Sequence, residues 1–449
     1  MKNTIKTLFC IGFFGLIACS KDDNQTAVID TPTGFEGKPE WVKTFGGSKE
    51  DNLLSVVEAV DGGYTAFGYT HSNDGDISDK TTTDNDYWVV KFTKDGIISW
   101  SKTYGGTSDD RGEKIFRTND GGYILAGYSR SNDGDVSVNA GLQDYWIVKI
   151  NETGEVQWEK SFGFPGIDRA HSVIQTKDNG YFITGFLDVT ASEGEGNDKR
   201  KKSEKHGVGE FWGIKLDSKG NKEWRRYYGG SDNDRSYDVL QTEDNGFLMI
   251  GSSESNDFDI TNSKGSYDFW AVKVNSEGTL VWQKSFGGSE TDVAYAIAAT
   301  GNGKYVIVGD TRSNDKDITD AKGNADLWAI QIDGNGNLIW QKSFGGTEFE
   351  TGRGIYKTND GNFILTGNSR SNDRDIPQNK GQSDALSILI NPNGEVLWRS
   401  IIGGSEAEFA TGCLETVDHK IIIVGSSESN DFDVNDNKGS KDAIIIKYK

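Results

Sequence analysis

A short tripeptide, usually aromatic-Gly-Gly, occurs seven times at nearly constant spacing and restricts the fold more than any other feature. Five successive spacings are 58 or 59 residues and one is 66. The seven copies begin at Phe45, Tyr104, Phe162, Tyr228, Phe286, Phe344 and Ile402. A fixed period of this kind indicates a repeat architecture, in which each unit buries its apolar face against its neighbours.

Each repeat is predicted to contain four short strands. In the fifth repeat these cover residues 293–300, 305–311, 327–332 and 338–344. Gly301-Asn302-Gly303 and Asp333-Gly334-Asn335-Gly336 separate two of the pairs, and such residues favour the positive φ angles of tight hairpin turns. No stretch shows sustained helical periodicity, so the chain is predicted to be all-β.

The ends of the repeat array predict how it closes. The array starts with a strand of the fourth type at 41–45 and ends with a strand of the third type at 442–448. Pairing these two completes the last unit and removes an exposed sheet edge. We therefore predict a seven-bladed β-propeller over residues 41–449, built of four-stranded antiparallel blades and closed by the N-terminal strand.

One repeat segment resembles a known family. Residues 287–297, Gly-Gly-Ser-Glu-Thr-Asp-Val-Ala-Tyr-Ala-Ile, and residues 309–313, Gly-Asp-Thr-Arg-Ser, are similar to the SBBP β-propeller repeat of bacterial surface proteins. The likeness covers about half of each unit. It implies the propeller fold and a bacterial surface location, but no activity.

The N-terminus reads as an export signal. Lys2 and Lys6 precede an apolar stretch at 8–17 that is too short to span a bilayer. Leu16-Ile17-Ala18-Cys19 resembles the lipobox of bacterial lipoproteins, which implies cleavage before Cys19 and its acylation, for example with palmitate. We expect a lipoprotein signal peptide at 1–18 and a lipidated cysteine with a flexible tether at 19–40. An ordinary signal peptide with a chance cysteine is the alternative.

The residues after Cys19 predict where the lipid anchor resides. Ser20-Lys21-Asp22-Asp23 lacks an aspartate directly after the cysteine and resembles the surface-export signal of some Gram-negative lipoproteins. The outer membrane, and there the cell surface, is the expected location, with the leaflet left open. The formal net charge of −21 argues against nucleic acid as a partner. The propeller is expected to be a monomer.

Residues repeated in every blade are most simply structural. All twelve tryptophans occupy two columns, one on strand three and one on strand four, where they are expected to fill the wedges between blades. Glycine holds the middle of strand two in every repeat, starting with Gly68, which predicts close approach of a neighbouring sheet. Cys413 replaces the Val or Ile of its column and is predicted to be a buried small hydrophobe.

The polar loop of six repeats contains the motif Ser-Asn-Asp-x-Asp. Closely spaced carboxylates suit Ca²⁺, whereas Asn and Asp side chains can equally cap the loop backbone, and both interpretations stay open. A further acidic column, from Asp51 to Glu408, follows each tripeptide and is expected on the same face. The candidate calcium ligands are Asp74, Asp76, Asp133, Asp135, Asp257, Asp259, Asp315, Asp317, Asp373, Asp375, Asp431 and Asp433.

An asymmetric ligand requires positions at which the blades differ, and these occur at the start of strand one, nearest the axis. Mixed cationic, acidic and aromatic side chains around one axis are typical of a polar-ligand pocket. A solvated channel mouth with drifting residues is the alternative. The candidate residues are Arg111, Glu113, Arg169, His171, Arg235, Tyr237, Tyr295 and Arg353.

Enzyme motifs are scarce. The four histidines stand at unrelated repeat positions, and no Gly-x-Ser-x-Gly elbow or phosphate-binding loop occurs. The sequence therefore favours a surface-exposed, non-catalytic binding or adhesion module that engages a glycan or protein through the acidic loop face. A propeller enzyme acting on carbohydrate and a structural subunit of an envelope complex are the alternatives.

Overall fold

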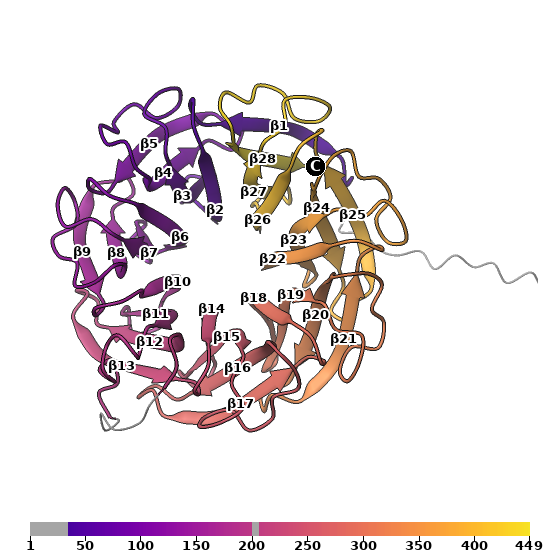
Figure 1. Cartoon of the computed structure of the whole chain (residues 1–449). Helices are drawn as coiled ribbons and strands as arrows, with labels where there is room; N and C mark the ends of the chain where they lie inside the picture. The colour runs from indigo at the N-terminus through magenta and orange to yellow at the C-terminus, as the bar shows by residue number, and fades with distance from the viewer. Residues whose placement is uncertain (1–34, 200–205) are drawn as a thin grey trace, which may run out of the picture. The chain divides into compact units, whose positions relative to one another are not determined.

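Seven four-stranded antiparallel sheets are arranged around a central axis in the computed structural model, which describes residues 35–199 and 206–449 (Figure 1). The predicted signal peptide, Cys19 and the first part of the predicted tether lie outside the described residues. Each sheet is a blade whose first strand lies innermost, and no helix occurs in the described part of the chain. The predicted all-β, seven-bladed β-propeller is confirmed.

The strand bounds follow the repeat. The first three blades are β2 (Asp51–Glu58), β3 (Tyr64–Thr70), β4 (Asp86–Phe92) and β5 (Ile98–Tyr104); β6 (Asp110–Arg117), β7 (Tyr123–Ser129), β8 (Asp144–Ile150) and β9 (Val156–Phe162); and β10 (Arg169–Gln175), β11 (Tyr181–Leu187), β12 (Glu210–Leu216) and β13 (Lys222–Tyr228). The next three are β14 (Asp234–Gln241), β15 (Phe247–Ser253), β16 (Asp268–Val274) and β17 (Leu280–Phe286); β18 (Asp292–Gly301), β19 (Lys304–Thr311), β20 (Asp326–Ile332) and β21 (Leu338–Phe344); and β22 (Glu350–Lys357), β23 (Phe363–Ser369), β24 (Asp384–Ile390) and β25 (Val396–Ile402).

The seventh blade joins the two ends of the propeller. It consists of β26 (Glu408–Glu415), β27 (Ile421–Ser427), β28 (Asp442–Tyr448) and, outermost, β1 (Pro39–Phe45). β1 pairs antiparallel with β28, with Val42 opposite Ile446 and Phe45 opposite Ala443. The predicted closure by the N-terminal strand is confirmed, although β1 begins two residues earlier than expected.

Residues just before β1 replace the turn that the split blade lacks. In three intact blades the outer tryptophan donates its indole N–H to a backbone carbonyl in the hairpin turn of the next blade, as Trp340 does to Pro392 at 3.1 Å. Trp398 donates instead to the carbonyl of Gly37 at 3.0 Å, and Phe35 packs edge-on against the same indole. Because Lys449 also bonds to Lys38 through its backbone N–H, the two chain ends together rebuild the missing turn.

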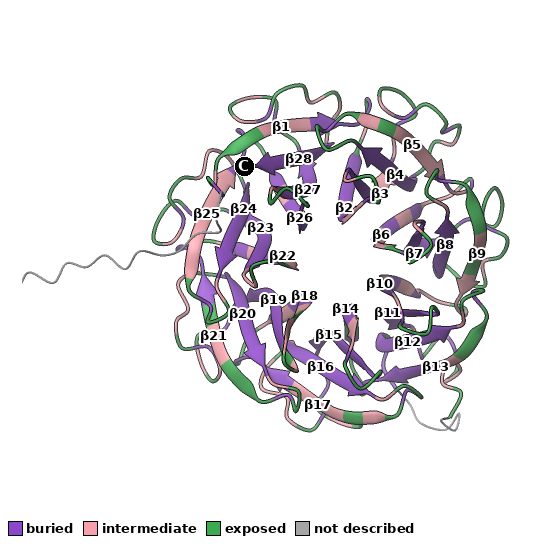
Figure 2. Ribbon diagram, turned by 180° about the vertical axis from the view of Figure 1, so that it is seen from behind, coloured by how far each residue is buried: buried purple, intermediate pink, exposed green. Residues whose placement is uncertain are grey.

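Each blade has a buried middle and a partly exposed rim. Figure 2 shows the two middle strands in purple, whereas the innermost and outermost strands are of mixed colour. The strand-three tryptophans, Trp88, Trp146, Trp212, Trp270 and Trp328, are fully buried, as predicted for wedge fillers. The strand-four tryptophans are only half-buried. Their rings cover the turn of the adjacent blade and therefore tie neighbouring blades together at the rim.

The strand-two glycines are required for a different reason from the expected close approach of a neighbouring sheet. A Cβ on Gly68 would collide with the carbonyl oxygen of Asn52 on strand one of the same blade, and the same clash recurs in the other blades. The contact arises because strand one carries a β-bulge there, with the register shifting between Leu53 and Ser55. The neighbour that demands glycine is thus mainly the bulged strand within the blade, and not an adjacent sheet.

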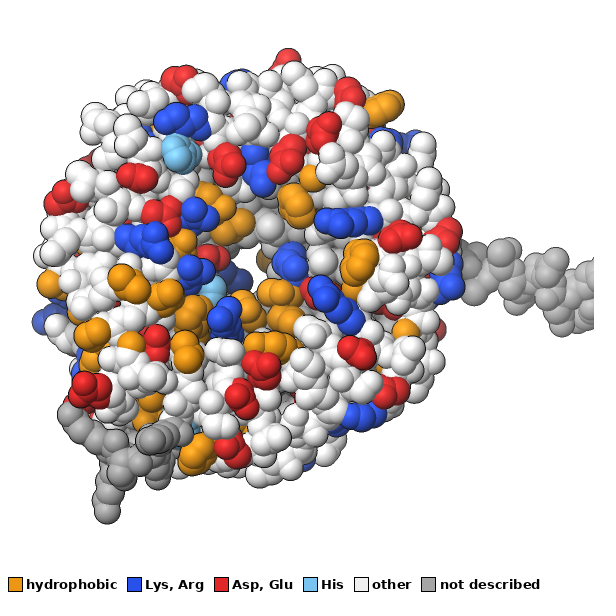
Figure 3. All heavy atoms as spheres, in the orientation of Figure 1, with side chains coloured by type: hydrophobic (Ala, Val, Ile, Leu, Met, Phe, Trp, Pro, Cys, Tyr) orange, Lys and Arg blue, Asp and Glu red, His pale blue; other side chains and the backbone are white. Residues whose placement is uncertain are grey.

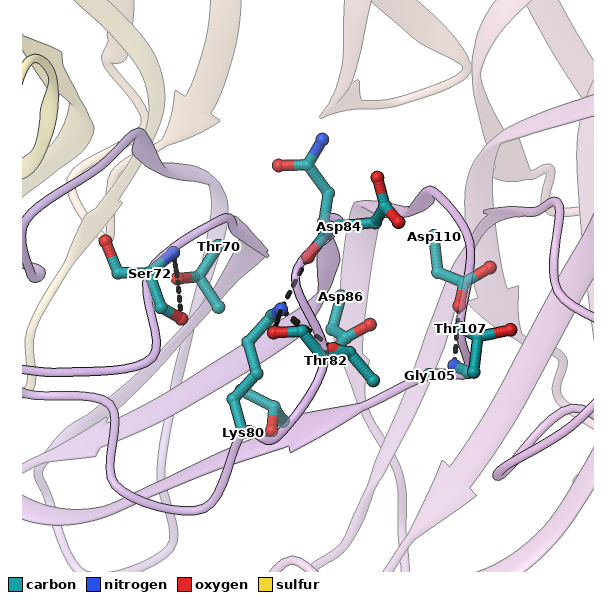
Figure 4. A network of polar contacts seen from close by, with 12 residues as sticks. Thr70, Ser72, Lys80, Thr82, Asp84, Asp86, Gly105, Thr107 and Asp110 are labelled. Carbon is teal, nitrogen blue, oxygen red and sulfur yellow. Dashed lines mark hydrogen bonds and ion pairs between the residues drawn. The ribbon is translucent and has the colours of Figure 1, made fainter.

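Buried carboxylates fill the junctions between blades. At the junction of the first two blades, Asp86 and Asp110 both face the Cα of Gly105, where a Cβ would strike their oxygens (Figure 4). Asp110 accepts the backbone N–H of Gly106 at 2.8 Å and the Ser131 hydroxyl at 2.8 Å. The acidic column that starts at Asp51 is fully buried in all seven blades, so it presents no carboxylate to a partner.

Lys80 gives the first junction a feature of its own. Its side chain is fully buried and donates to the carbonyls of Thr82 at 2.9 Å and Asp84 at 2.5 Å, with Asp86 3.5 Å away (Figure 4). Burial lowers the pKa of Lys80, and the charge of Asp86 partly offsets that effect. The ammonium group therefore organises the long loop of this blade and is not offered to a ligand.

Candidate functional site

A cavity of about 430 Å³ lies on the propeller axis, lined by the innermost strands. Five of the eight axial candidates line it, namely Glu113, His171, Tyr237, Tyr295 and Arg353. Each is the bulge residue of its strand: the register shifts between Ala170 and Ser172 in β10, for example, which leaves His171 without a cross-strand partner. A bulge re-aims a side chain, so the same distortion in each blade presents one variable residue to the axis.

Aromatic rings form one continuous row along this cavity. The ring centroids of His171 and Tyr237 are 5.0 Å apart, and those of Tyr237 and Tyr295 are 4.9 Å apart. The Arg353 guanidinium lies over the Tyr295 ring at 3.7 Å. Burial raises the pKa of both tyrosines, so their hydroxyls stay protonated at neutral pH and can donate hydrogen bonds.

Charged groups stand at both ends of the aromatic row. The Oε2 atom of Glu113 lies 4.0 Å from Nδ1 of His171. At the other end Arg353 pairs with Asp310 at 2.8 Å. Burial raises the pKa of Asp310, although the charge and hydrogen bond of Arg353 oppose this shift. The cavity therefore offers an acceptor and a donor at opposite ends of a row of mutually tilted aromatic rings.

A second polar layer was missed by the sequence analysis. Lys114 reaches from the second blade to Asp238 in the fourth, with Nζ and Oδ1 3.4 Å apart. Ser172 of the third blade donates its hydroxyl to the same carboxylate at 2.7 Å. These residues follow the bulge directly, and regular alternation would turn them away from the axis, so no local pattern could have indicated them.

Cys413 also lines the cavity, on a side formed by small residues including Gly354 and Gly412. The thiol belongs to a residue that is only 8% exposed, and burial raises its pKa to about 12. It is therefore a neutral thiol at physiological pH. The predicted role of a buried small hydrophobe is confirmed.

The other three candidates, Arg111, Arg169 and Arg235, are not part of the cavity lining. They stand at the starts of β6, β10 and β14, two residues before the bulge. Figure 3 shows lysine, arginine and hydrophobic side chains around the central opening on the face from which the propeller is viewed. The structure thus separates the predicted set into a cavity layer and a group of arginines beside it.

The Ser-Asn-Asp-x-Asp loops bind the backbone of the tripeptide region. The first carboxylate accepts the N–H two residues after the first glycine, as Asp315 does from Ser289 at 2.8 Å. The second accepts the N–H of the first glycine itself, as Asp317 does from Gly287 at 3.1 Å. The same pair of bonds recurs at the other candidate pairs, namely Asp74 and Asp76, Asp133 and Asp135, Asp257 and Asp259, Asp373 and Asp375, and Asp431 and Asp433.

Lysines from the preceding blade reach several of these second carboxylates. Lys322 pairs with Asp375 at 3.1 Å, and Lys438 pairs with Asp76 at 2.5 Å across the ring closure. Lys264 with Asp317 and Lys380 with Asp433 form equivalent pairs. These geometries match the backbone-capping alternative. Among residues 35–199 and 206–449 no group of three or more His, Cys, Asp or Glu side chains could hold a metal ion.

Chelation tests the calcium alternative directly. Because backbone N–H groups and lysines already occupy the candidate carboxylates, adding EDTA is expected to leave the melting temperature of the full chain unchanged within about 1 °C. The measurement is thermal unfolding of one preparation with EDTA, with added Ca²⁺ and with added Mg²⁺. A Ca²⁺-specific rise of several degrees, reversed by EDTA, would restore calcium as a bound cofactor.

No protein-family model matches the chain, so membership of the SBBP repeat family stays a prediction. One curated relative is the "Regulatory protein FlaEY" of Caulobacter vibrioides, which is 23% identical over 265 residues. That match covers 54% of this chain and 27% of the relative, so the chain spans about a quarter of that protein's length.

Solved structures that resemble the chain share little sequence with it. A Bacteroides caccae protein of unknown function is 14% identical, with a TM-score of 0.38, and the match covers 68% of this chain and 94% of that one. The Neurospora crassa Pan2 WD40 domain is 9% identical, with a TM-score of 0.45 and coverage of 91% and 96%. The propeller domain of the Pyrococcus furiosus Trilobed protease is 10% identical, with a TM-score of 0.42 and coverage of 86% and 90%. With TM-scores below 0.5, these similarities support no inference about activity. The fold assignment rests on the strand pairing.

Proposed function

We propose that this protein is a lipid-anchored, surface-displayed binding module whose propeller takes a ligand into its axial cavity. The observation that supports this most strongly is the shared position of Glu113, His171, Tyr237, Tyr295 and Arg353, which come from five different blades and line one cavity. A cavity of about 430 Å³ falls within the range of small-molecule sites, about 300–1,000 Å³. The ligand is a glycan, or a polar group carried by a protein.

The membrane part of this proposal rests on the N-terminal sequence. Cys19 would carry the lipid, and residues 19–40 would connect it to the propeller at the outer membrane. In the described residues no helix is long and apolar enough to cross a membrane. The acyl chains would supply the attachment.

Binding without turnover is the expected result when the full chain is tested on glycan and peptide arrays. Replacing Tyr237 by Ala removes the central ring of the aromatic row and is expected to weaken the captured ligand at least about tenfold, because a buried aromatic contact contributes roughly 1.5–3 kcal/mol. Isothermal titration of wild type and Y237A measures this change. Full binding by a folded Y237A variant would refute the axial site.

An enzyme acting on carbohydrate is the second candidate, and one observation favours it. Glu113 and His171 stand 4.0 Å apart in the cavity, and a closer approach on substrate binding would bring them into the hydrogen-bond range of about 2.6–3.2 Å that acid–base catalysis requires. Chromatography of the array hits after prolonged incubation separates the two functions. Product release that E113Q abolishes would support the enzyme, and unchanged saccharide would support the binding module.

A further inference from the structure

Three arginines on consecutive blades form a cationic group beside the axial cavity of a strongly acidic protein. The chain as a whole carries a formal net charge of −21. Arg111, Arg169 and Arg235 stand at corresponding positions of β6, β10 and β14. The other four blades carry Asn52, Val293, Thr351 and Phe409 there, so the positive charge is confined to one side of the axis.

Aromatic rings of the preceding blade hold the arginines in place. The guanidinium carbons lie over the rings of Tyr69 at 5.0 Å for Arg111, of Tyr128 at 4.7 Å for Arg169, and of Phe186 at 4.9 Å for Arg235. Such cation–π contacts orient a planar guanidinium without neutralising its charge.

Two of these arginines lack an acidic partner. Arg111 pairs with Asp109 at 2.9 Å. Within the described parts of the chain, by contrast, no carboxylate lies within 4.0 Å of Arg169 or Arg235. The Nε of Arg169 donates to the neutral side chain of Gln143 at 2.5 Å. In the described part of the chain, therefore, no ion pair balances these two positive charges.

The cationic group and the cavity meet at Phe186. Its ring lies 5.8 Å from the His171 ring of the aromatic row, and the Arg235 guanidinium lies over the same ring at 4.9 Å. The charges of Arg235 and Arg353 also oppose the rise that burial causes in the pKa of Tyr237. A molecule that rests on the aromatic row can therefore extend an anionic group toward Arg235 and Arg169. Of the carboxylates nearby, Asp109 pairs with Arg111 and Asp310 with Arg353, whereas Glu113 lies 4.0 Å from Nδ1 of His171.

We propose that the axial site binds an acidic saccharide, with its carboxylate held by Arg169 and Arg235 and its ring against the His171–Tyr237–Tyr295 row. This inference rests on the proposed function and names its ligand class. Arginine suits a carboxylate because its planar fork can form paired hydrogen bonds. Tyrosine and histidine offer a flat apolar face with polar atoms at the edge, which matches a ring that carries hydroxyls.

Calorimetric titration of the full chain with four probes tests the proposal. Glucuronic acid and N-acetylneuraminic acid carry a carboxylate, glucose is the neutral match of the first, and inorganic phosphate is an anion without a sugar ring. The acidic sugars are expected to bind at least about tenfold more tightly than glucose, because their carboxylate forms charge-assisted hydrogen bonds that glucose cannot form. Their affinity should also fall as salt is raised.

Three variants with the same change of charge locate the effect. R169Q and R235Q are expected to weaken the acidic sugars by roughly ten- to a hundredfold and to leave glucose unaffected. R117Q is the matched control, because Arg117 is exposed and ends β6, the strand near whose start Arg111 stands. It is expected to bind like the wild type. Melting curves of all three establish that they fold.

The outcomes separate this inference from the proposed function. Equal binding of glucose and glucuronic acid, unaltered in R169Q and R235Q, would overturn the acidic-sugar inference. The proposed function as a binding module would still stand. Phosphate that competes as strongly as glucuronic acid would overturn the saccharide part. If no acidic sugar binds at millimolar concentration, the inference fails, and the array experiment with Y237A judges the proposed function by itself.

Discussion

A chain that begins at residue 46 is expected to lose its stable closed ring. It would lack β1 and therefore the whole outer strand of the seventh blade. β28, which is buried along its full length, would become an exposed apolar edge. Burying a large apolar side chain contributes about 1.5–3 kcal/mol, so removing Phe35, Val42 and Phe45 alone costs several kcal/mol. Only about 5–15 kcal/mol separates folded from unfolded states in typical proteins.

Thermal unfolding and light scattering measure this loss. The shortened chain should unfold at least about 10 °C earlier than the full chain, or aggregate through its open edge. A chain beginning at residue 35 is the matched control and should melt like the full chain, since the described contacts of the closure start at Phe35. A synthetic peptide of residues 35–46 added to the shortened chain should restore part of the stability. An unchanged melting temperature would show that β1 does not close the ring.

The protein is expected to be more stable near pH 5 than near pH 8. At the blade junctions, burial raises the pKa to about 6 for Asp86, Asp234, Asp268, Asp326, Asp384 and Asp442, and to about 8 for Asp168. An acid whose pKa is raised by folding binds a proton more tightly in the folded state. Its stabilising contribution is complete below the unfolded pKa of about 3.9 and is lost as the pH rises through 6, or through 8 for Asp168.

Other carboxylates limit the stability of the folded protein at lower pH. Lysine partners and hydrogen bonds lower the pKa of Asp61, and they lower that of Asp244 to about 2 against the opposing effect of burial. These carboxylates stabilise the folded state above their unfolded pKa of about 3.9, and this contribution is lost as the pH falls from there toward their lower folded pKa. The melting temperature should therefore pass through a maximum between about pH 4 and pH 5.5.

One substitution isolates the junction carboxylates from the effect of net charge. The Oδ1 of Asp268 is buried without a hydrogen-bond partner, and the charge of Asp292 contributes to its raised pKa. D268N supplies the neutral form permanently, so it should raise the melting temperature at pH 8 and reduce its fall between pH 5 and pH 8. E290Q makes the same charge change at an exposed side chain and should keep the wild-type slope. Identical slopes in the two variants would contradict the assignment.

Blade three departs from the repeat at two positions that contact each other in the other blades. Its tripeptide is Phe162-Gly163-Phe164, and its loop lacks the Ser-Asn-Asp-x-Asp motif. The sequence shows both departures but not that one makes the other possible. In the other blades a Cβ on the second glycine would collide with the motif's serine and first aspartate, as Ser313 and Asp315 surround Gly288. Loss of the motif therefore frees the space that Phe164 fills.

The repeat period, the turn residues and the strand types at the two ends of the array were enough to predict the number of blades, the four strands in each and the closure by the N-terminal strand. These features are local and are repeated seven times, so turn residues and spacing are sufficient to reveal them. Which polar residues a ligand can reach depends instead on how the blades pack against one another. Acidic side chains recur at the same positions in six or all seven repeats, yet hydrogen bonds between loops and ion pairs between blades occupy them. The β-bulge of each first strand turned His171 and Tyr237 toward the axis. Packing around the ring, which no single repeat contains, left Arg169 and Arg235 without an acidic partner among the residues that the structure describes.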